Sequence, residues 1–183
     1  QQWLNQQPHS LPLGLLMADL HRRSGALEAA RRELEQLLRL HPSNQELLQL
    51  AVLVDLQDGR GQNALQLLQS QFAQRPEGQR LELGLLLADL QRQLGQTKAA
   101  ASSYQKLAKE SAEDVSAVIA LAMLHQEQGD AAEVERWLDQ ARLRRGNDDR
   151  PDPMIDELAY RWGLRAARVR AEQQRPEVSA PAP

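Results

Sequence analysis

The sequence predicts an all-α protein built from repeated pairs of amphipathic helices. Leu, Ala, Gln, Glu and Arg dominate its 183 residues, and aromatic residues make up only 3%, a composition that favours helices over strands. Residues 11–38 and 81–108 align without a gap and share 13 identical residues in 28 positions. Such self-similarity at a fixed spacing indicates a repeat architecture.

Regularly spaced turn residues define the repeat. Four glycines follow one another at 34, 36 and 34 residues, namely Gly25, Gly59, Gly95 and Gly129. Between them, leucines and alanines recur every three or four residues in segments of about 13–15 residues, which is typical of amphipathic helices. Each glycine is predicted to end a first helix through a left-handed cap. Pro42 and Pro76, each 17 residues after a glycine, are predicted to end second helices.

These units resemble tetratricopeptide repeats. The 34-residue pattern of that family has small, Gly, Ala, large, apolar and Pro residues at set positions, filled in the first unit by Ala18, Gly25, Ala30, Leu34, Leu37 and Pro42. The resemblance covers four units: 11–44, 45–80, 81–114 and 115–148. It implies a right-handed α-solenoid of helix–turn–helix repeats. The chain departs from the pattern where the family has a large aromatic residue, since His21, Asp55, Gln91 and His125 stand there, and where Gly14 and Gly84 replace a large residue.

The two ends of the chain fall outside these four units. Residues 1–10 are expected to form a lead-in or short docking segment. Residues 149–175 are expected to form a helix, continuous over about 154–174, that caps the last repeat. Its apolar stripe would comprise Ile155, Leu158, Trp162, Ala166 and Val169. The tail, 176–183, is small and Pro-rich and is expected to be disordered.

The resemblance also implies where a partner would bind. In tetratricopeptide arrays the first helices of successive units line a concave groove. The matching positions here are Leu15, Asp19, Arg22, Arg23, Gln49, Leu53, Leu56, Leu85, Asp89, Arg92, Ile119 and Met123. Exposed apolar residues in such a surface favour a docked peptide or helix. Two alternatives stay open: the Asp and Arg residues form ordinary pairs within one helix, or the leucines are covered by residues 1–10 or by a second copy.

The sequence gives no positive sign of catalysis, a cofactor or a metal site. It contains no cysteine, no HExxH, GxSxG or phosphate-loop motif, and its four histidines are scattered. The acidic residues Asp148, Asp149 and Asp152 lack the spacing of a calcium loop and are expected to form a solvated turn. We therefore expect a protein that is not an enzyme and needs no cofactor.

Charge and hydropathy narrow the kind of partner. The formal net charge is −3. Over all positions that the family uses for binding, Glu46, Glu82 and Glu127 join the residues named above, so that five acidic side chains stand against three arginines, which argues against nucleic acid. The arginines between Arg161 and Arg175 are interpreted as the solvated flank of the capping helix. No apolar run is long enough to span a bilayer. Because the sequence begins with Gln1, we expect that a signal peptide or anchor could have preceded it, and the compartment stays open.

Two functional hypotheses follow. The first is a protein–protein interaction module that docks a peptide or helical segment of a partner, as a scaffold or assembly factor for a multi-subunit or membrane complex. The second is a structural protein that forms homo-oligomers through its groove or a repeat face. A mass that depends on concentration would favour the second hypothesis.

Overall fold

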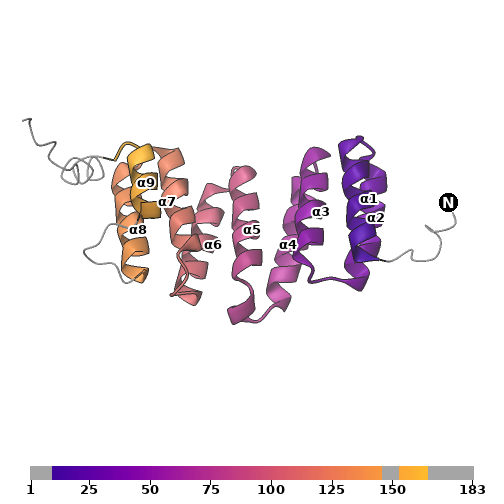
Figure 1. Ribbon diagram of the computed structural model, residues 1–183, viewed down its shortest axis with the longest axis horizontal. Coiled ribbons are helices and arrows are strands. Elements are labelled where there is room, and N and C mark those ends of the chain that lie inside the picture. Colours follow the sequence, from indigo (N-terminus) through magenta and orange to yellow (C-terminus); the bar gives the residue numbers. More distant parts are fainter. Residues whose placement is uncertain (1–9, 146–152, 165–183) are drawn as a thin grey trace, which may run out of the picture. The chain divides into compact units, whose positions relative to one another are not determined.

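The structure is a computed structural model that describes residues 10–145 and 153–164, and it confirms an all-α repeat fold of the solenoid class. The described residues form nine α-helices and one short 3-10 helix (Figure 1). In chain order these are α1 (Leu11–Arg23), α2 (Leu27–Leu40), α3 (Gln45–Gln57), α4 (Gly61–Gln74), η1 (Glu77–Gln79), α5 (Leu81–Gln93), α6 (Thr97–Glu110), α7 (Ser116–Gln128), α8 (Ala131–Arg144) and α9 (Pro153–Arg161). The chain divides into two compact units, Gln1–Ser103 and Tyr104–Pro183, with the boundary inside α6.

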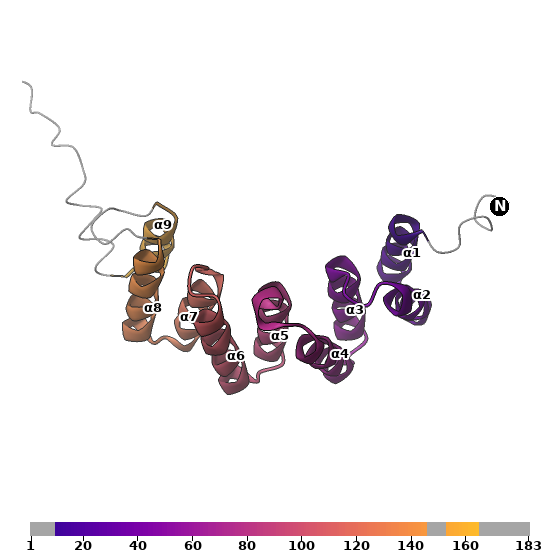
Figure 2. The same ribbon diagram turned by 90° about the horizontal axis from the view of Figure 1, so that it is seen from below.

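The first unit has two layers of helices. Figure 2 shows α1, α3 and α5 in one layer and α2 and α4 in the other. Each second helix packs against the first helix of its own pair and against the first helix of the next pair. A side chain on α3 therefore faces α2, α4 or solvent, depending on its position along the helix.

The turn inside each pair has the predicted geometry. Gly25 has φ +79°, a left-handed conformation that glycine adopts without the steric penalty of a Cβ. The next residue, Ala26, donates its backbone N–H to the carbonyl oxygen of His21 at 2.8 Å, and Gly25 donates to that of Arg22 at 3.1 Å. This pair of bonds satisfies carbonyl groups that the helix end leaves open. Gly59, Gly95 and Gly129 repeat the positive φ and the same two bonds.

The core between the first two pairs comes from evenly spaced apolar side chains. Ala30, Leu34 and Leu37 of α2 form one buried cluster with Leu47 and Val54 of α3. These two α3 side chains are at most 1% exposed and the three on α2 at most 2%. The cluster explains why α2, which presents a single apolar side, is stable only when it is packed between neighbouring first helices.

Gly14 stands where the family has a large residue, and the space for a larger side chain is filled by Leu37. A Cβ at Gly14 would lie 2.6 Å from Leu37 Cδ1 and 2.8 Å from its Cδ2, so the buried leucine occupies the space that a larger residue at position 14 would need. The missing side chain of α1 is thus compensated by a large side chain on α2.

In the second unit, an arginine ties α8 to the segment before α7. Arg144 donates from Nη2 to the carbonyl oxygen of Ala108 at 2.6 Å and from Nη1 to those of Asp114 at 2.7 Å and Ser111 at 3.1 Å. The guanidinium group thereby satisfies carbonyl groups at the end of α6 and in the following loop.

The expected capping helix is shorter than predicted, and the prediction of a continuous helix over 154–174 is wrong. Helix α9 ends at Arg161, Gly163 has φ +68°, and Leu164 N–H donates to the carbonyl oxygen of Ala159 at 3.1 Å. Gly163 lies 34 residues after Gly129, so the repeat period continues and this turn matches the four before it. Ile155 and Ala159 of α9 are buried, as expected for a helix that packs on α8.

Several predictions fall outside the described residues. These are the lead-in up to residue 9, the acidic residues Asp148, Asp149 and Asp152, the stripe residues Ala166 and Val169, and the tail 176–183.

Candidate functional site

The candidate site of the first unit is the layer formed by α1, α3 and α5, which we call the first-helix face. It carries ten of the predicted residues: Leu15, Asp19, Arg22 and Arg23 on α1, Gln49, Leu53 and Leu56 on α3, and Leu85, Asp89 and Arg92 on α5. The three helices lie in one layer (Figure 2), and α1 and α3 are in contact. The amphipathic pattern of each helix turns its strongest apolar side toward the second helices and leaves a narrower stripe on this face.

Leu53 is the most exposed apolar residue of the predicted set. It lies in the middle of α3 with 51% of its surface exposed. Leu15 on α1 and Leu85 on α5 are half-buried, and Leu15 also packs against the buried cluster of α2 and α3. Leu53 is therefore the predicted apolar residue with the largest exposed fraction on this face.

Leu56 has a different environment. It is half-buried and packs against the cluster formed by Leu65, Leu68 and their neighbours of α4 and α5. A change at Leu56 would therefore alter the packing of α4 and α5 as well as the surface, so Leu53 alone is the cleaner residue for a binding test.

The charged residues of the face pair within their own helices. Asp19 accepts from Arg22 Nη2 at 2.7 Å and lies 2.6 Å from Arg23 Nε. The hydrogen bond from Arg22 lowers the pKa of Asp19, burial opposes the shift, and the nearby charge of Arg23 adds to the lowering. On α5, Asp89 and Arg92 lie farther apart, at 3.8 Å. The structure therefore contains the intrahelical pairs of the first alternative.

The remaining predicted residues lie on α7 in the second unit. Met123 is 46% exposed and Ile119 is half-buried. Met123 stands six residues before Gly129, as Leu53 stands six residues before Gly59. The second unit thus repeats the exposed apolar position of the first.

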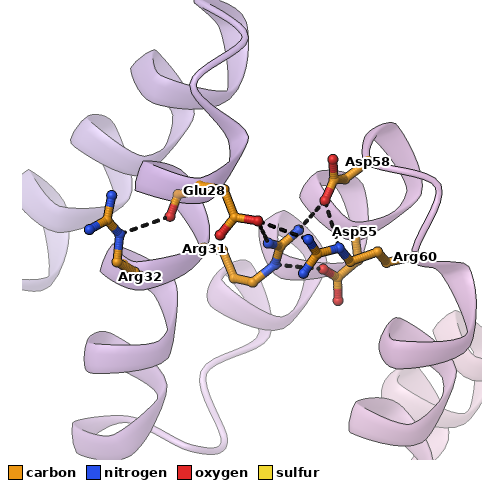
Figure 3. Close-up of polar contacts among 6 residues, drawn as sticks. All are labelled: Glu28, Arg31, Arg32, Asp55, Asp58 and Arg60. Atoms are coloured by element: carbon orange, nitrogen blue, oxygen red, sulfur yellow. Dashed lines mark hydrogen bonds and ion pairs between the residues drawn. The ribbon is translucent and has the colours of Figure 1, made fainter.

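Sequence analysis missed a network of charges between the first two pairs (Figure 3). Arg31 of α2 lies within 3.2 Å of Asp55 on α3, 2.6 Å of Asp58 in the α3–α4 turn and 2.7 Å of Glu28 on its own helix. Arg60 joins the network through Glu28 and Asp58, each at 2.8 Å. Burial tends to lower the pKa of Arg31, but the hydrogen bonds that it donates to Asp58, Glu28 and Asp55 outweigh this effect and raise the pKa.

The departure of Asp55 from the family pattern could have indicated this network. Asp55 replaces a large aromatic residue that would pack between neighbouring units, and its side chain is only 13% exposed. A carboxylate at such a place needs a cationic partner. The partner, Arg31, is 24 residues away in sequence, and no local pattern pairs the two.

A hollow of about 210 Å³ lies beside this network, on the side of the second helices. Leu34, Ala51 and Val54 line it, together with Arg31 and Asp55. Glu35 lines it as well, and Arg31 and Asp55 already pair with each other. We therefore keep the candidate site on the first-helix face, which carries the exposed Leu53.

The described residues contain no group of three or more His, Cys, Asp or Glu side chains that could hold a metal ion. Within the same part of the chain, no helix is long and apolar enough to cross a bilayer.

Comparisons with known proteins agree with this architecture. Residues 91–152 match a family model described as tetratricopeptide repeat. A tetratricopeptide repeat protein from Parabacteroides merdae ATCC 43184 aligns with a TM-score of 0.60 and 21% identity over 93% of this chain and 67% of that chain. The kinesin light chain TPR-like repeats of Podosopora anserina (Q17M) align with a TM-score of 0.62 and 18% identity over 92% and 94%.

A third similar structure is the APC/C hetero-tetramer Cut9-Hcn1. It aligns with a TM-score of 0.55 and 18% identity, over 81% of this chain but only 29% of that chain. No curated protein matches the sequence. At these identities the structural likeness shows the fold alone.

The helix pairs, their glycine turns and the 34-residue period define a helical-repeat protein, a class whose units bury their apolar sides only by packing on one another. Residues 91–152 match the tetratricopeptide repeat model, and the similar structures show that the chain has the fold of tetratricopeptide repeat proteins. Repeats of this family are protein–protein interaction modules.

Proposed function

We propose that the first-helix face binds a peptide or helical segment of a partner protein, with Leu53 as its central anchor. The observation that carries the proposal is the 51% exposure of Leu53 in the middle of α3. The half-buried Leu15 on α1 and Leu85 on α5 add apolar groups to the same layer. Burying the exposed half of a leucine is favourable by about 1 kcal/mol.

The charged groups of the face would orient the partner. Arg22, Arg23 and Arg92 gather at the C-terminal ends of α1 and α5, whereas Glu46 and Glu82 stand in the first turns of α3 and α5. A segment lying across the helices would meet basic groups along one edge and acidic groups along the other. Charge complementarity of this kind fixes register more than it adds affinity.

On the second unit, Ile119 and Met123 offer the same kind of contact on α7. We propose that they form a partner-contacting surface of the second unit by itself, and that the protein acts without catalysis as a scaffold or assembly factor. The similar Cut9-Hcn1 structure is a hetero-tetramer of the APC/C, which supports an assembly role by analogy only.

The proposal is tested with Leu53→Gln and a matched control, Leu40→Gln. Leu40 ends α2 and is 53% exposed, so both variants remove one half-exposed leucine, from different layers of the unit. Peptides selected on the wild-type protein from a random display library serve as probes, and their Kd values are measured by fluorescence anisotropy.

We expect Leu53→Gln to weaken the selected peptides about fivefold and Leu40→Gln to leave them unchanged, with the melting temperature of both variants close to that of the wild type. Equal affinity for Leu53→Gln and the wild type would refute the proposed site. Sedimentation over a wide concentration range tests the alternative of self-association: a dimer that Leu53→Gln dissociates would place a second copy on this face.

A further inference from the structure

The hollow beside the charge network is large enough for one side chain of another protein. It measures about 210 Å³ and is lined by residues of α2, α3 and α4. An apolar cavity of about 150 Å³ is enough to hold a benzene ring, whereas pockets for drug-sized molecules measure about 300–1,000 Å³. Its apolar lining comprises Leu34, Leu38, Ala51, Val54 and Leu67.

At the next pair of helices, the equivalent place is filled by leucines of this chain. Counting from the turn glycines, Arg31 of α2 corresponds to Leu65 of α4, and Ala51 of α3 corresponds to Leu87 of α5. Leu65 and Leu87 are 5% and 6% exposed and belong to one buried cluster. The hollow therefore lies where the chain has an alanine and an arginine in place of two buried leucines, and a large apolar side chain suits it.

Arg31 does not favour an anionic occupant, because its guanidinium group is already engaged (Figure 3). Nε donates to Asp55 at 3.2 Å, Nη1 to Glu28 at 2.7 Å and Nη2 to Asp58 at 2.6 Å. All three nitrogens of the group thus donate to carboxylates of this chain. An anion in the hollow would have to compete with three carboxylates for one cation.

Two other polar groups of the lining are free to meet a partner. Glu35 of α2 and Asn63 of α4 are both exposed. In the part of the chain that the structure describes, neither side chain makes a hydrogen bond or an ion pair. Arg32 and Arg39 stand one turn before and after Glu35 on α2, but they do not line the hollow. A free carboxylate at an apolar hollow is complementary to a cation beside an apolar group.

We propose that the hollow binds one large apolar side chain of a separate protein, and that a lysine or arginine next to it in the partner's sequence pairs with Glu35. The amide of Asn63 would hydrogen-bond to the partner's backbone. This second contact site lies on the side of the second helices, and Leu53 does not line it.

Three blocked dipeptides serve as probes: N-acetyl-phenylalanyl-lysinamide, N-acetyl-phenylalanyl-glutamate amide and N-acetyl-glycyl-lysinamide. Each is titrated into the isotope-labelled full chain, and the chemical shifts of the Ala51 and Leu67 backbone amides give its Kd by NMR. The variants are Glu35→Lys, Ala51→Leu and the charge-matched control Glu33→Lys. Glu33 lies on the same helix but does not line the hollow.

We expect the wild type to bind the phenylalanyl-lysine probe about two- to fivefold more tightly than the phenylalanyl-glutamate probe. Glu35→Lys should reverse this preference, whereas Glu33→Lys should leave it unchanged. Ala51→Leu, which gives α3 the leucine that α5 has, should abolish binding of both probes while circular dichroism shows the same helix content. If Ala51→Leu does not fold, the two glutamate variants still decide the question, because neither change is made in the core.

Four outcomes would overturn the proposal. The first is that the Ala51 and Leu67 amides of the wild type do not shift with the phenylalanyl-lysine probe. The second is the same preference in Glu35→Lys as in the wild type, and the third is equal binding of the glycyl-lysine probe. The fourth is a wild-type dimer that Ala51→Leu dissociates in sedimentation, which would make a second copy the occupant. Failure here leaves the proposed function of the first-helix face untouched, since that proposal rests on Leu53 and is tested by Leu53→Gln.

Discussion

Replacing Gly14 with alanine should destabilise the protein, although alanine is the better helix former. Gly14 lies inside α1, and glycine in a helix interior costs about 1 kcal/mol relative to alanine. The added Cβ would lie 2.6 Å from Cδ1 and 3.2 Å from Cγ of Leu37. Leu37 is 2% exposed and is held by its cluster, so it cannot turn away without disturbing its neighbours.

The two effects oppose each other, and the clash should win. Forcing an extra carbon into a well-packed core typically costs about 1–3 kcal/mol. Subtracting the gain in helix propensity leaves an expected net loss of about 1–2 kcal/mol in the free energy of unfolding for Gly14→Ala. Leu37→Ala alone should cost about 2–5 kcal/mol, because it leaves a cavity.

The decisive test is to measure the effect of Gly14→Ala in two backgrounds, the wild type and Leu37→Ala. In the Leu37→Ala background the clashing atoms are absent, so Gly14→Ala should stabilise the protein by about 1 kcal/mol. Urea unfolding followed by circular dichroism gives the four free energies of this double-mutant cycle. If Gly14→Ala stabilised the protein in both backgrounds, α1 and α2 would not pack as described.

Three further predictions concern charges and turns. Arg31→Met should lower the free energy of unfolding by about 2–3 kcal/mol, since it strands the carboxylate of Asp55, whereas Arg32→Met on the exposed side of α2 should be nearly neutral in the same urea assay. The pKa of Asp19 is lowered in the folded state from its ordinary value of 3.8. The pairing of its carboxylate therefore stabilises the protein at pH values above 3.8, and this stabilisation is lost as the pH falls through the lower pKa of the folded state. The difference in the free energy of unfolding between wild type and Asp19→Asn should shrink below about pH 4. Gly59→Ala places a side chain at φ +72° and should cost about 1–2 kcal/mol, whereas Gly78→Ala, with open space around it, should be close to neutral in thermal melts.

The period of the sequence predicted the helix pairs well because their turns are local. A glycine at φ +79° such as Gly25, followed by a residue that bonds back to the helix, is encoded within a few residues. Alternation of apolar residues then fixes which side of each helix is buried. These features need no knowledge of which helices are neighbours.

The C-terminal helix shows where reading the apolar stripe alone failed. Ile155, Leu158 and Trp162 suggested one long helix, but Gly163 ends it with the turn geometry of the four earlier glycines. The 34-residue spacing from Gly129 was present in the sequence. The 34-residue glycine spacing predicts the end of this helix better than the apolar stripe does, because a glycine in the left-handed conformation ends a helix even where the apolar pattern continues.

The candidate site was less predictable than the fold. Leu53 is exposed as expected of a binding residue, but Leu56, three residues later, is half-buried among side chains of α4 and α5. The difference depends on how closely neighbouring pairs approach each other. The pairing of Arg31 with Asp55 has the same origin, since it joins residues 24 positions apart.

Helices α1 and α5 have nearly the same sequence, and the positions at which they differ lie mainly on one helix side. Between 11–25 and 81–95 the two differ at five positions, and three of these, Met17/Leu87, His21/Gln91 and Ser24/Leu94, fall at spacings of four and three along one helix side. On α5 this side meets the preceding pair, since Leu94 lies against Gly61, and Leu87 joins the cluster of α4.

Where the neighbour differs, the duplicate has changed, yet Leu13, Leu16 and Leu20 of α1 remain identical to Leu83, Leu86 and Leu90. On α5, Leu83 and Leu90 are buried and Leu86 is half-buried, whereas Leu16 and Leu20 of α1 are more than half exposed. At one of the changed positions the α5 side chain contacts the following helix, because Gln91 accepts a hydrogen bond from Ser103 of α6 at 2.7 Å, and α1 has His21 in its place.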